Sequence, residues 1–197
     1  YNHKVLFFLR PRRFGKSLFL SMLEYYYGID HKEKFNSLFG SYYIGQTGNS
    51  TPLKNSYYIL NFNFSGIMTD DTDNIFSSFS IEVRTQVSRF LRVYNLFDET
   101  RNREILKESG AIDILRNLFS AVNSLDEKPK IFILIDEYDH FTNELLAFKT
   151  DHFKRLVSQN GWVRKFYEVI KQYVGEGVID RFIATGVTPV TLDSLTS

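Results

Sequence analysis

A basic loop joins two apolar segments near the start of the chain, and this arrangement limits the folds open to the sequence. Residues 5–9 (VLFFL) form an apolar run with the length of a buried strand, and residues 18–26 have the character of a helix. Between them runs RPRRFGKS, residues 10–17. A strand, a basic loop ending in Gly-Lys-Ser and a helix, in that order, predict a phosphate-binding P-loop.

Each part of this loop has a physical task in binding phosphate. Gly15 lets the backbone approach an anion without an intervening Cβ atom, and the first helix amides, aided by the helix dipole, point at that anion. Lys16 is expected to reach the β- and γ-phosphates, and the Ser17 hydroxyl to ligate Mg²⁺. The expected nucleotide-binding residues are therefore Arg12, Arg13, Phe14, Gly15, Lys16, Ser17 and Leu18.

The loop departs from the usual G-x-x-x-x-G-K-[ST] pattern at one position. Arg10 stands where the first glycine belongs, and arginine is a poor choice if the backbone must take a positive φ there. A basic surface turn between a strand and a helix is the alternative interpretation of these residues.

Length and composition are those of one globular domain. The 197 residues suffice for a sizeable core, and we expect residues 1–197 to form one P-loop core. The chain begins without Met and stops after a strand-like run, so we expect it to be part of a longer protein. Hydrophobic and charged contents of 43% and 24% are ordinary. The 19 Phe and 12 Tyr predict a core filled by aromatic rings.

Charge and composition also exclude several classes of function. The 24 Lys and Arg against 23 Asp and Glu leave a net charge of +1, which gives no case for nucleic-acid binding. Cysteine is absent, which excludes disulfides, thiolate metal sites and cysteine nucleophiles. No apolar run approaches the roughly 20 residues of a membrane helix, and no signal peptide is visible. A cytoplasmic protein without a membrane segment is expected.

The rest of the chain alternates between strand and helix patterns, which indicates an α/β layered fold. Residues 31–56 are interpreted as an irregular insertion with little chemistry. Strands are expected at 4–9, 57–64, 131–135 and 181–187, and the one at 57–64 has a polar face or edge. Helices are expected at 16–27, 74–95, 101–124 (with Gly110 able to break it) and 151–174.

A second motif strengthens the first. Residues 131–135 (IFILI) are apolar without alternation, which predicts a strand buried on both faces, as in a parallel sheet. Asp136 at its carboxyl end is expected to hold Mg²⁺ opposite Ser17. Glu137 is expected to orient and deprotonate an attacking water. Surface carboxylates at a strand end are the alternative interpretation.

Two further polar residues stay open. Three roles suit Asp139: it binds a second-shell water, caps the next helix, or contacts Lys or Arg of the phosphate loop. Thr185, at the end of the last strand, fits the sensor 1 position of ATPases, where a polar side chain hydrogen-bonds the attacking water or the γ-phosphate. A simple turn residue is the alternative for Thr185.

Other polar groups favour structural roles. The acidic run at residues 70–73 suits the start of a helix better than a metal loop. The histidines show no metal-ligand spacing; they are His3, His31, His140 and His152.

Three motifs carry a resemblance to a known family. Residues 10–23 (RPRRFGKSLFLSML) are very similar to the start of the predicted AAA-ATPase-like family. Residues 134–139 (LIDEYD) and 182–187 (FIATGV) resemble its Walker B segment and its sensor strand. Together the matches span nearly the whole chain in the right order. In this family the first glycine of the loop is commonly missing, which accounts for Arg10.

The resemblance implies an ASCE-type P-loop ATPase, a three-layer α/β/α sandwich with a mainly parallel sheet. It places a glutamate base on the strand beside the P-loop strand. Family members are bacterial and often carry a C-terminal nuclease-like domain of the PD-(D/E)XK kind, through which nucleic acid would be a partner. Residues 1–197 do not themselves indicate that nuclease.

ATPases of this class also use a helical lid and an arginine, supplied in cis or by a neighbour, which makes a homo-oligomer one of the expected states. No lid follows Thr185. Arg12 and Arg13 are expected to replace that arginine in part, to pair with acids such as Asp139, or to contact a partner.

The sequence thus predicts an enzyme that binds and hydrolyses ATP with Mg²⁺ and that drives or gates an attached domain. Glu137, Lys16 and Thr185 are the expected catalytic residues, and Ser17 and Asp136 the metal ligands. One alternative is a nucleotide-gated interaction module with little hydrolysis, and another is a nucleic-acid-binding module built on the basic loop. A small P-loop kinase shares the loop, but the Asp-Glu pair favours an ATPase. ATP rather than GTP follows from the resemblance.

Overall fold

The computed structural model describes residues 3–68, 72–140, 143 and 161–189. Strands and helices alternate, which confirms the expected α/β class. The elements in chain order are β1 (Val5–Leu9), α1 (Lys16–Tyr27), η1 (Ile29–Lys34), α2 (Phe35–Phe39), η2 (Tyr43–Gly45), β2 (Tyr58–Asn63), η3 (Phe64–Gly66), α3 (Thr72–Tyr94), α4 (Glu99–Ile105), α5 (Ala111–Asn123), β3 (Ile131–Asp136), α8 (Trp162–Gly175) and β4 (Ile179–Gly186).

The four described strands form one parallel sheet in the order β1-β4-β3-β2. Because all strands run the same way, their carboxyl ends meet at one edge of the sheet, where α/β proteins bind ligands. One expectation is wrong: the strand that carries Glu137 is not beside the P-loop strand, since β4 lies between β3 and β1. The last described strand, β4, thus lies in the interior of the described sheet.

Side-chain burial explains this order. Phe182 and Ala184 of β4 are buried, and every residue of β3 is buried, as the unbroken apolar run predicted. Asn61 and Asn63 give β2 a polar character that suits the edge of the described sheet. β1 occupies the opposite edge.

The first strand has the length of a buried strand, but the start of β1 is exposed. Val5 and Leu6 are 42% and 45% exposed, because β4 is the one described strand that flanks β1. Only the second half of β1 is partly buried, and that half leads into the phosphate loop.

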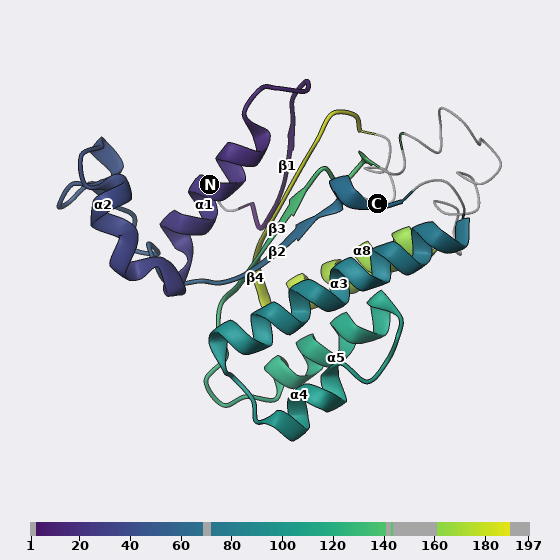
Figure 1. Ribbon diagram of the computed structural model, residues 1–197. Helices are drawn as coiled ribbons and strands as arrows, with labels where there is room; N and C mark the ends of the chain where they lie inside the picture. Colours follow the sequence, from purple (N-terminus) through teal and green to yellow (C-terminus); the bar gives the residue numbers. More distant parts are fainter. Residues whose placement is uncertain (1–2, 69–71, 141–142, 144–160, 190–197) are drawn as a thin grey trace.

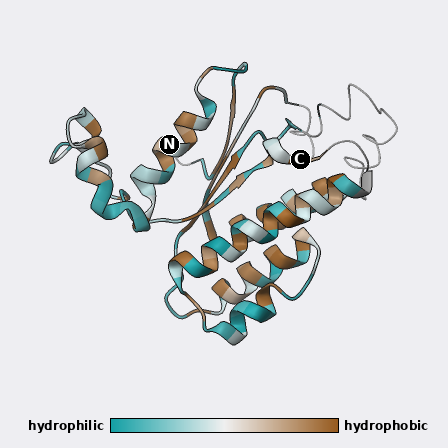
Figure 2. Cartoon of the chain, in the orientation of Figure 1, coloured by the Kyte–Doolittle hydropathy of each residue, from teal (hydrophilic) through white to brown (hydrophobic). Residues whose placement is uncertain are grey.

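Helices cover the two faces of the sheet in separate layers (Figure 1). α1 lies on one face, α3 and α8 lie on the other, α5 packs against α3 and α8, and α4 packs against α5. Apolar side chains line the strands and the inner faces of these helices (Figure 2). A smaller apolar cluster lies under α1; it contains Leu20, Tyr57, Ile59, Phe132 and Leu134.

Aromatic rings fill the larger core, as the composition predicted. Phe79 of α3 lies 4.9 Å from Phe166 of α8 and 5.1 Å from Phe64, measured between ring centroids. Phe62 of β2 is 6.0 Å from Phe166. Such tilted and edge-on pairs are favourable beyond the area that they bury, so they fix the outer helices against the sheet.

The remaining helices agree with the sequence where the structure describes them. The segment 101–124 is broken as expected, and Gly110 is the N-cap of α5. The insertion forms η1, α2 and η2 and projects from the body of the molecule (Figure 1). The helix predicted from residue 151 is described from Trp162 onward, and the acidic run at 70–73 lies outside the described side chains. None of the described helices is long and apolar enough to cross a membrane.

Candidate nucleotide-binding site

The phosphate loop makes its left-handed turns at Arg13 and Gly15, with φ values of 68° and 72°. Arg10 is not among the residues with positive φ, so arginine at this position meets no steric objection. Its backbone N–H instead donates to the carbonyl of Gly186 at 3.1 Å. The start of the loop is thereby fixed to the end of β4.

The loop curls around the side chain of Lys16. This residue is only 6% exposed, and its Nζ donates to the carbonyl oxygens of Arg10 at 3.2 Å and Pro11 at 3.3 Å. Both partners are neutral, and Lys16 forms no ion pair within the described parts of the chain. Because its described hydrogen-bond partners are carbonyls and not carboxylates, the Lys16 amino group is suited to pair with an anion.

The N-terminus of α1 is open to an anion as well. The N-cap residue, Gly15, has no side chain to accept a hydrogen bond from the first helix amides, and the first turn contains no acidic residue. The Phe19 amide is bonded to Gly15, so the amides of Lys16, Ser17 and Leu18 precede the first intrahelical bond and carry the positive end of the dipole. The Leu18 side chain is 66% exposed, so Leu18 is suited to contribute through its amide.

Asp136 and Thr185 meet at the carboxyl ends of β3 and β4. Oδ1 of Asp136 accepts hydrogen bonds from the Thr185 hydroxyl at 2.5 Å and from the Glu137 amide at 3.0 Å. Asp136 is 7% exposed and Thr185 is fully buried. The Thr185 hydroxyl therefore donates its one proton to Asp136 and orients this carboxylate.

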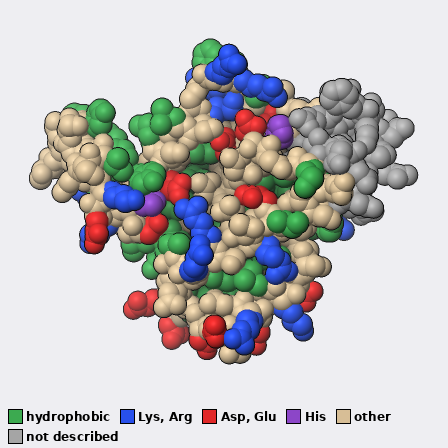
Figure 3. Space-filling view, in the orientation of Figure 1, with side chains coloured by type: hydrophobic (Ala, Val, Ile, Leu, Met, Phe, Trp, Pro, Cys, Tyr) green, Lys and Arg blue, Asp and Glu red, His purple; other side chains and the backbone are tan. Residues whose placement is uncertain are grey.

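Glu137, which ends the Asp136-Glu137 motif, lies next to the phosphate loop. Its φ of 52° is left-handed, so the chain turns sharply where β3 ends. Glu137 and six loop and helix residues line one open hollow. These are Arg12, Arg13, Gly15, Lys16, Ser17 and Leu18. At this end of the molecule, basic side chains gather next to acidic ones (Figure 3).

The model of a known family matches the chain over residues 1–196, and its description is "Predicted AAA-ATPase". The chain belongs to this AAA-ATPase-like family. Searches of curated proteins and of solved structures return no match. Membership supports nucleotide binding and an ATPase-like function in general terms.

The three remaining predicted loop residues of this AAA-ATPase-like chain, Arg12, Arg13 and Phe14, differ in their placement. Arg12 lines the hollow and has no ion pair within the described structure, so the alternative of a salt bridge to Asp139 is not realised; the same holds for Arg13. The Phe14 side chain is 67% exposed and is not part of the lining.

Asp139 binds the backbone that follows β4, a role that the sequence did not suggest. The Asp139 carboxylate accepts hydrogen bonds from the backbone beyond β4, at Val187 and Thr188. Gly186 faces this contact, and a Cβ atom there would lie 2.4 Å from the Tyr138 ring. The one signal of this contact in the sequence is Gly186 directly after Thr185, because a strand often has glycine where another segment approaches its backbone closely.

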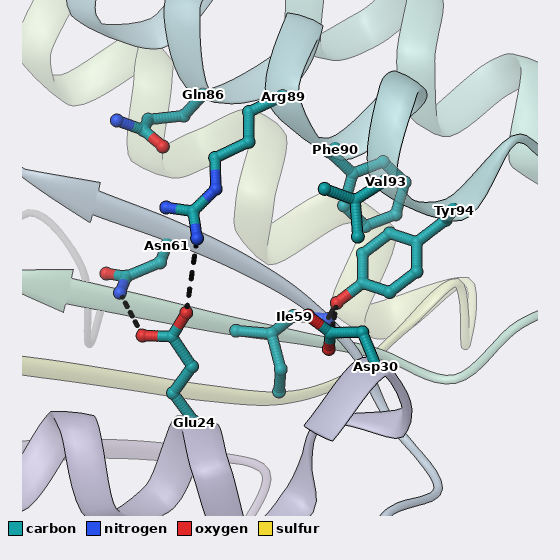
Figure 4. A pocket seen from close by; sticks show the side chains of 9 residues that line it. All are labelled: Glu24, Asp30, Ile59, Asn61, Gln86, Arg89, Phe90, Val93 and Tyr94. Atoms are coloured by element: carbon teal, nitrogen blue, oxygen red, sulfur yellow. Dashed lines mark hydrogen bonds and ion pairs between the residues drawn. The ribbon is translucent and has the colours of Figure 1, made fainter. Parts of the chain in front are cut away.

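A second, smaller pocket lies between α1, β2 and α3, and its polar groups already pair with one another (Figure 4). Glu24 accepts from the Asn61 amide at 2.8 Å and lies 3.8 Å from the Arg89 guanidinium. The Tyr94 hydroxyl donates to Asp30 at 3.1 Å and accepts from the Ile59 amide at 2.8 Å. These contacts join α1, β2 and α3, which border this small pocket.

The Tyr94 hydroxyl remains protonated well beyond neutral pH. Burial raises the pKa of Tyr94 far above its ordinary value of 10.0, and the adjacent Asp30 carboxylate raises it further. The bond from the Ile59 amide acts in the opposite direction. Tyr94 is therefore a lasting hydrogen-bond donor in the joint between α3 and β2.

Proposed function

We propose that this chain is a Mg²⁺-dependent ATPase domain that hydrolyses ATP at the edge of the sheet where β1, β4 and β3 end. The observation that carries the proposal is the hollow shared by the phosphate loop and Glu137. A loop for phosphate and a carboxylate able to act as a general base thus border the same space.

The residues present fit a magnesium nucleotide. Lys16 is buried without an ion pair in the described structure, and the α1 amides beside it are uncapped. The Ser17 hydroxyl and the Asp136 carboxylate are the oxygen ligands that Mg²⁺ prefers. When bound, the ion supplies positive charge beside the phosphates.

Each residue then has one task in the reaction. Lys16 and the amides of residues 15–18 hold the phosphates in place. Ser17 and Asp136 hold the metal, and Thr185 keeps Asp136 oriented. Glu137 accepts the proton of the water that attacks the γ-phosphate. The products are ADP and inorganic phosphate.

Phosphate release tests the proposal. The wild type is expected to release phosphate from ATP only with Mg²⁺, and Glu137→Gln to lose about 10²- to 10⁴-fold in kcat because it removes the base. Glu127→Gln is the matched control, since this exposed residue precedes the opposite end of β3. It should keep the wild-type rate.

Two results would contradict the proposal. Equal rates for Glu137→Gln and the wild type would show that Glu137 is not the base. ATP binding with no turnover by the wild type would leave the nucleotide-gated module as the function of this site.

A further inference from the structure

The side chain of Asp139 is a buried anchor for the chain that leaves β4. It is 2% exposed, and its Oδ2 accepts from the amides of Val187 at 3.0 Å and Thr188 at 2.7 Å. The Asn143 side-chain amide also donates to this oxygen at 2.8 Å, and the Thr188 hydroxyl lies 2.9 Å from it and 2.8 Å from Oδ1 of Asn143, so its one proton serves either acceptor. Bonds to an ionised acceptor are about twice as strong as neutral ones, so this oxygen holds the exit of β4 firmly.

Tyr138 holds the same segment from the adjacent position. Its backbone N–H donates to the Thr185 carbonyl at 3.0 Å, and its hydroxyl donates to the Thr188 carbonyl at 2.5 Å. The regular pairing of β3 with β4 ends at Ile135 and Ala184. Bonds from residues 138 and 139 to residues 185–188, which we term the strand-end clamp, thus continue the connection beyond the sheet.

The clamp leaves no free space at its centre. A Cβ atom on Gly186 would lie 2.4 Å from Cε1 of Tyr138 and 2.5 Å from Oδ1 of Asp139. Both distances are below any normal contact, so only glycine fits between the two side chains. The Gly186 carbonyl in turn accepts from the Arg10 amide, which ties the phosphate loop to the same point.

The site residues border this clamp directly in sequence. Glu137 precedes Tyr138, and Thr185 precedes Gly186. Glu137 stands on a left-handed turn with a side chain that is about one third exposed. Oε2 of Glu137 lies 3.5 Å from Nδ1 of His140. The direction of Glu137 therefore depends on how residues 138–140 are held, and the clamp holds residues 138 and 139.

We propose that Asp139 is a positioning residue of the ATPase: through the strand-end clamp it holds Glu137 and Thr185 in register with the phosphate loop. This inference rests on the proposed function. Asp139 acts through the backbone and does not touch the phosphates. Its loss should therefore lower turnover and leave nucleotide affinity intact.

Two measurements on Asp139→Asn test this inference. The kcat for ATP is expected to fall about 10- to 100-fold, the cost of a small misplacement of a reacting group, whereas the Kd for ATP stays within about twofold. Amide hydrogen exchange is expected to rise at residues 136–138 and 187–188. Asp126→Asn, an exposed aspartate before β3, is the matched control and should change neither.

A milder pair of variants covers the case in which Asp139→Asn does not fold. Thr188→Val removes the hydroxyl that contacts both Asp139 and Asn143, keeps the backbone bonds of the clamp, and is expected to lower kcat by less, without weakening ATP binding. Thr188→Ser keeps the hydroxyl and should restore the rate.

The outcomes separate this inference from the proposed function. Faster exchange with an unchanged kcat would overturn it, as would kcat and ATP affinity that fall together with stability. If the wild type binds ATP without turnover, the proposed hydrolysis has failed, and amide exchange alone tests the clamp. Faster exchange at residues 136–138 in Asp139→Asn would then support the clamp. Unchanged exchange there would overturn it.

Discussion

Left-handed backbone at single residues shapes both halves of the site. Arg13 and Gly15 turn the phosphate loop, and Glu137 turns the chain after β3. A non-glycine residue with positive φ costs free energy, and such residues cluster where function requires a particular direction. Two of these three positions bear a charged side chain that borders the hollow.

Gly186 provides a test at the residue scale. Gly186→Ala is expected to lower the free energy of unfolding by about 1–3 kcal/mol, because its Cβ atom would overlap the Tyr138 ring and the Asp139 carboxylate. Denaturant titration measures this change. Gly175→Ala is the control: its Cβ atom would meet nothing within 4 Å, so stability should be unchanged or slightly higher. Equal stability of the two variants would contradict the close packing at Gly186.

The candidate site residues that the sequence proposes belong to local motifs. Lys16 and Ser17 are adjacent in one loop, and Asp136 and Glu137 are adjacent at one strand end. The clamp could not be predicted, because Asp139 and its partner Thr188 are 49 positions apart. Backbone amides bind any carboxylate that reaches them, so such a contact leaves no pattern in the side chains.

At the scale of elements, one tyrosine joins α3 to the edge of β2. The Tyr94 hydroxyl satisfies the outward amide of Ile59 and donates to Asp30. An unpaired strand edge would otherwise invite association with other chains. The joint thus closes part of the sheet edge while it fixes the long helix.

Tyr94→Phe is expected to lower the free energy of unfolding by about 1–3 kcal/mol at neutral pH, because it leaves the Ile59 amide without its acceptor. The pKa of Tyr94 is raised in the folded state, so above pH 10 the unfolded chain loses this proton first. The free energy of unfolding therefore falls as pH rises from about 10.

In Tyr94→Phe this alkaline decline should be shallower than in the wild type. It should not vanish, because the pKa of Tyr57 and that of Tyr167 are also raised, mainly by burial. Denaturant titrations between pH 7 and 11 measure both effects. Tyr43→Phe, at a residue that is 72% exposed, is the control at neutral pH, where stability should change by less than about 0.5 kcal/mol. An equal loss in both variants would contradict the joint.

Periodicity predicted the elements better than their order in the sheet. The helix 16–27 and the break at Gly110 follow from local residue types, which act over a few positions. The place of β4 between β1 and β3 depends on which apolar strand is buried on both sides, and several strands of this chain could satisfy that condition. Strand order was therefore the part of the fold where the expectation was wrong: β4, and not β3, lies beside β1.

At the scale of the whole molecule, the parallel sheet brings distant motifs together. The phosphate loop follows β1, Glu137 follows β3, and Gly186 is the last residue of β4, yet all three lie at one edge of the sheet. Two apolar layers hold this edge in place. The central claim is that this edge binds a nucleotide through its phosphates.

Calorimetric titration with ATP and Mg²⁺, on the wild type and on Lys16→Ala, tests this claim most directly. The wild type should bind one ATP, and Lys16→Ala should lose at least about tenfold in affinity, since 1.4 kcal/mol corresponds to a factor of ten. Lys130→Ala, an exposed lysine before the opposite end of β3, should bind like the wild type. Equal ATP affinity in the wild type and Lys16→Ala, or no binding by the wild type, would contradict the account.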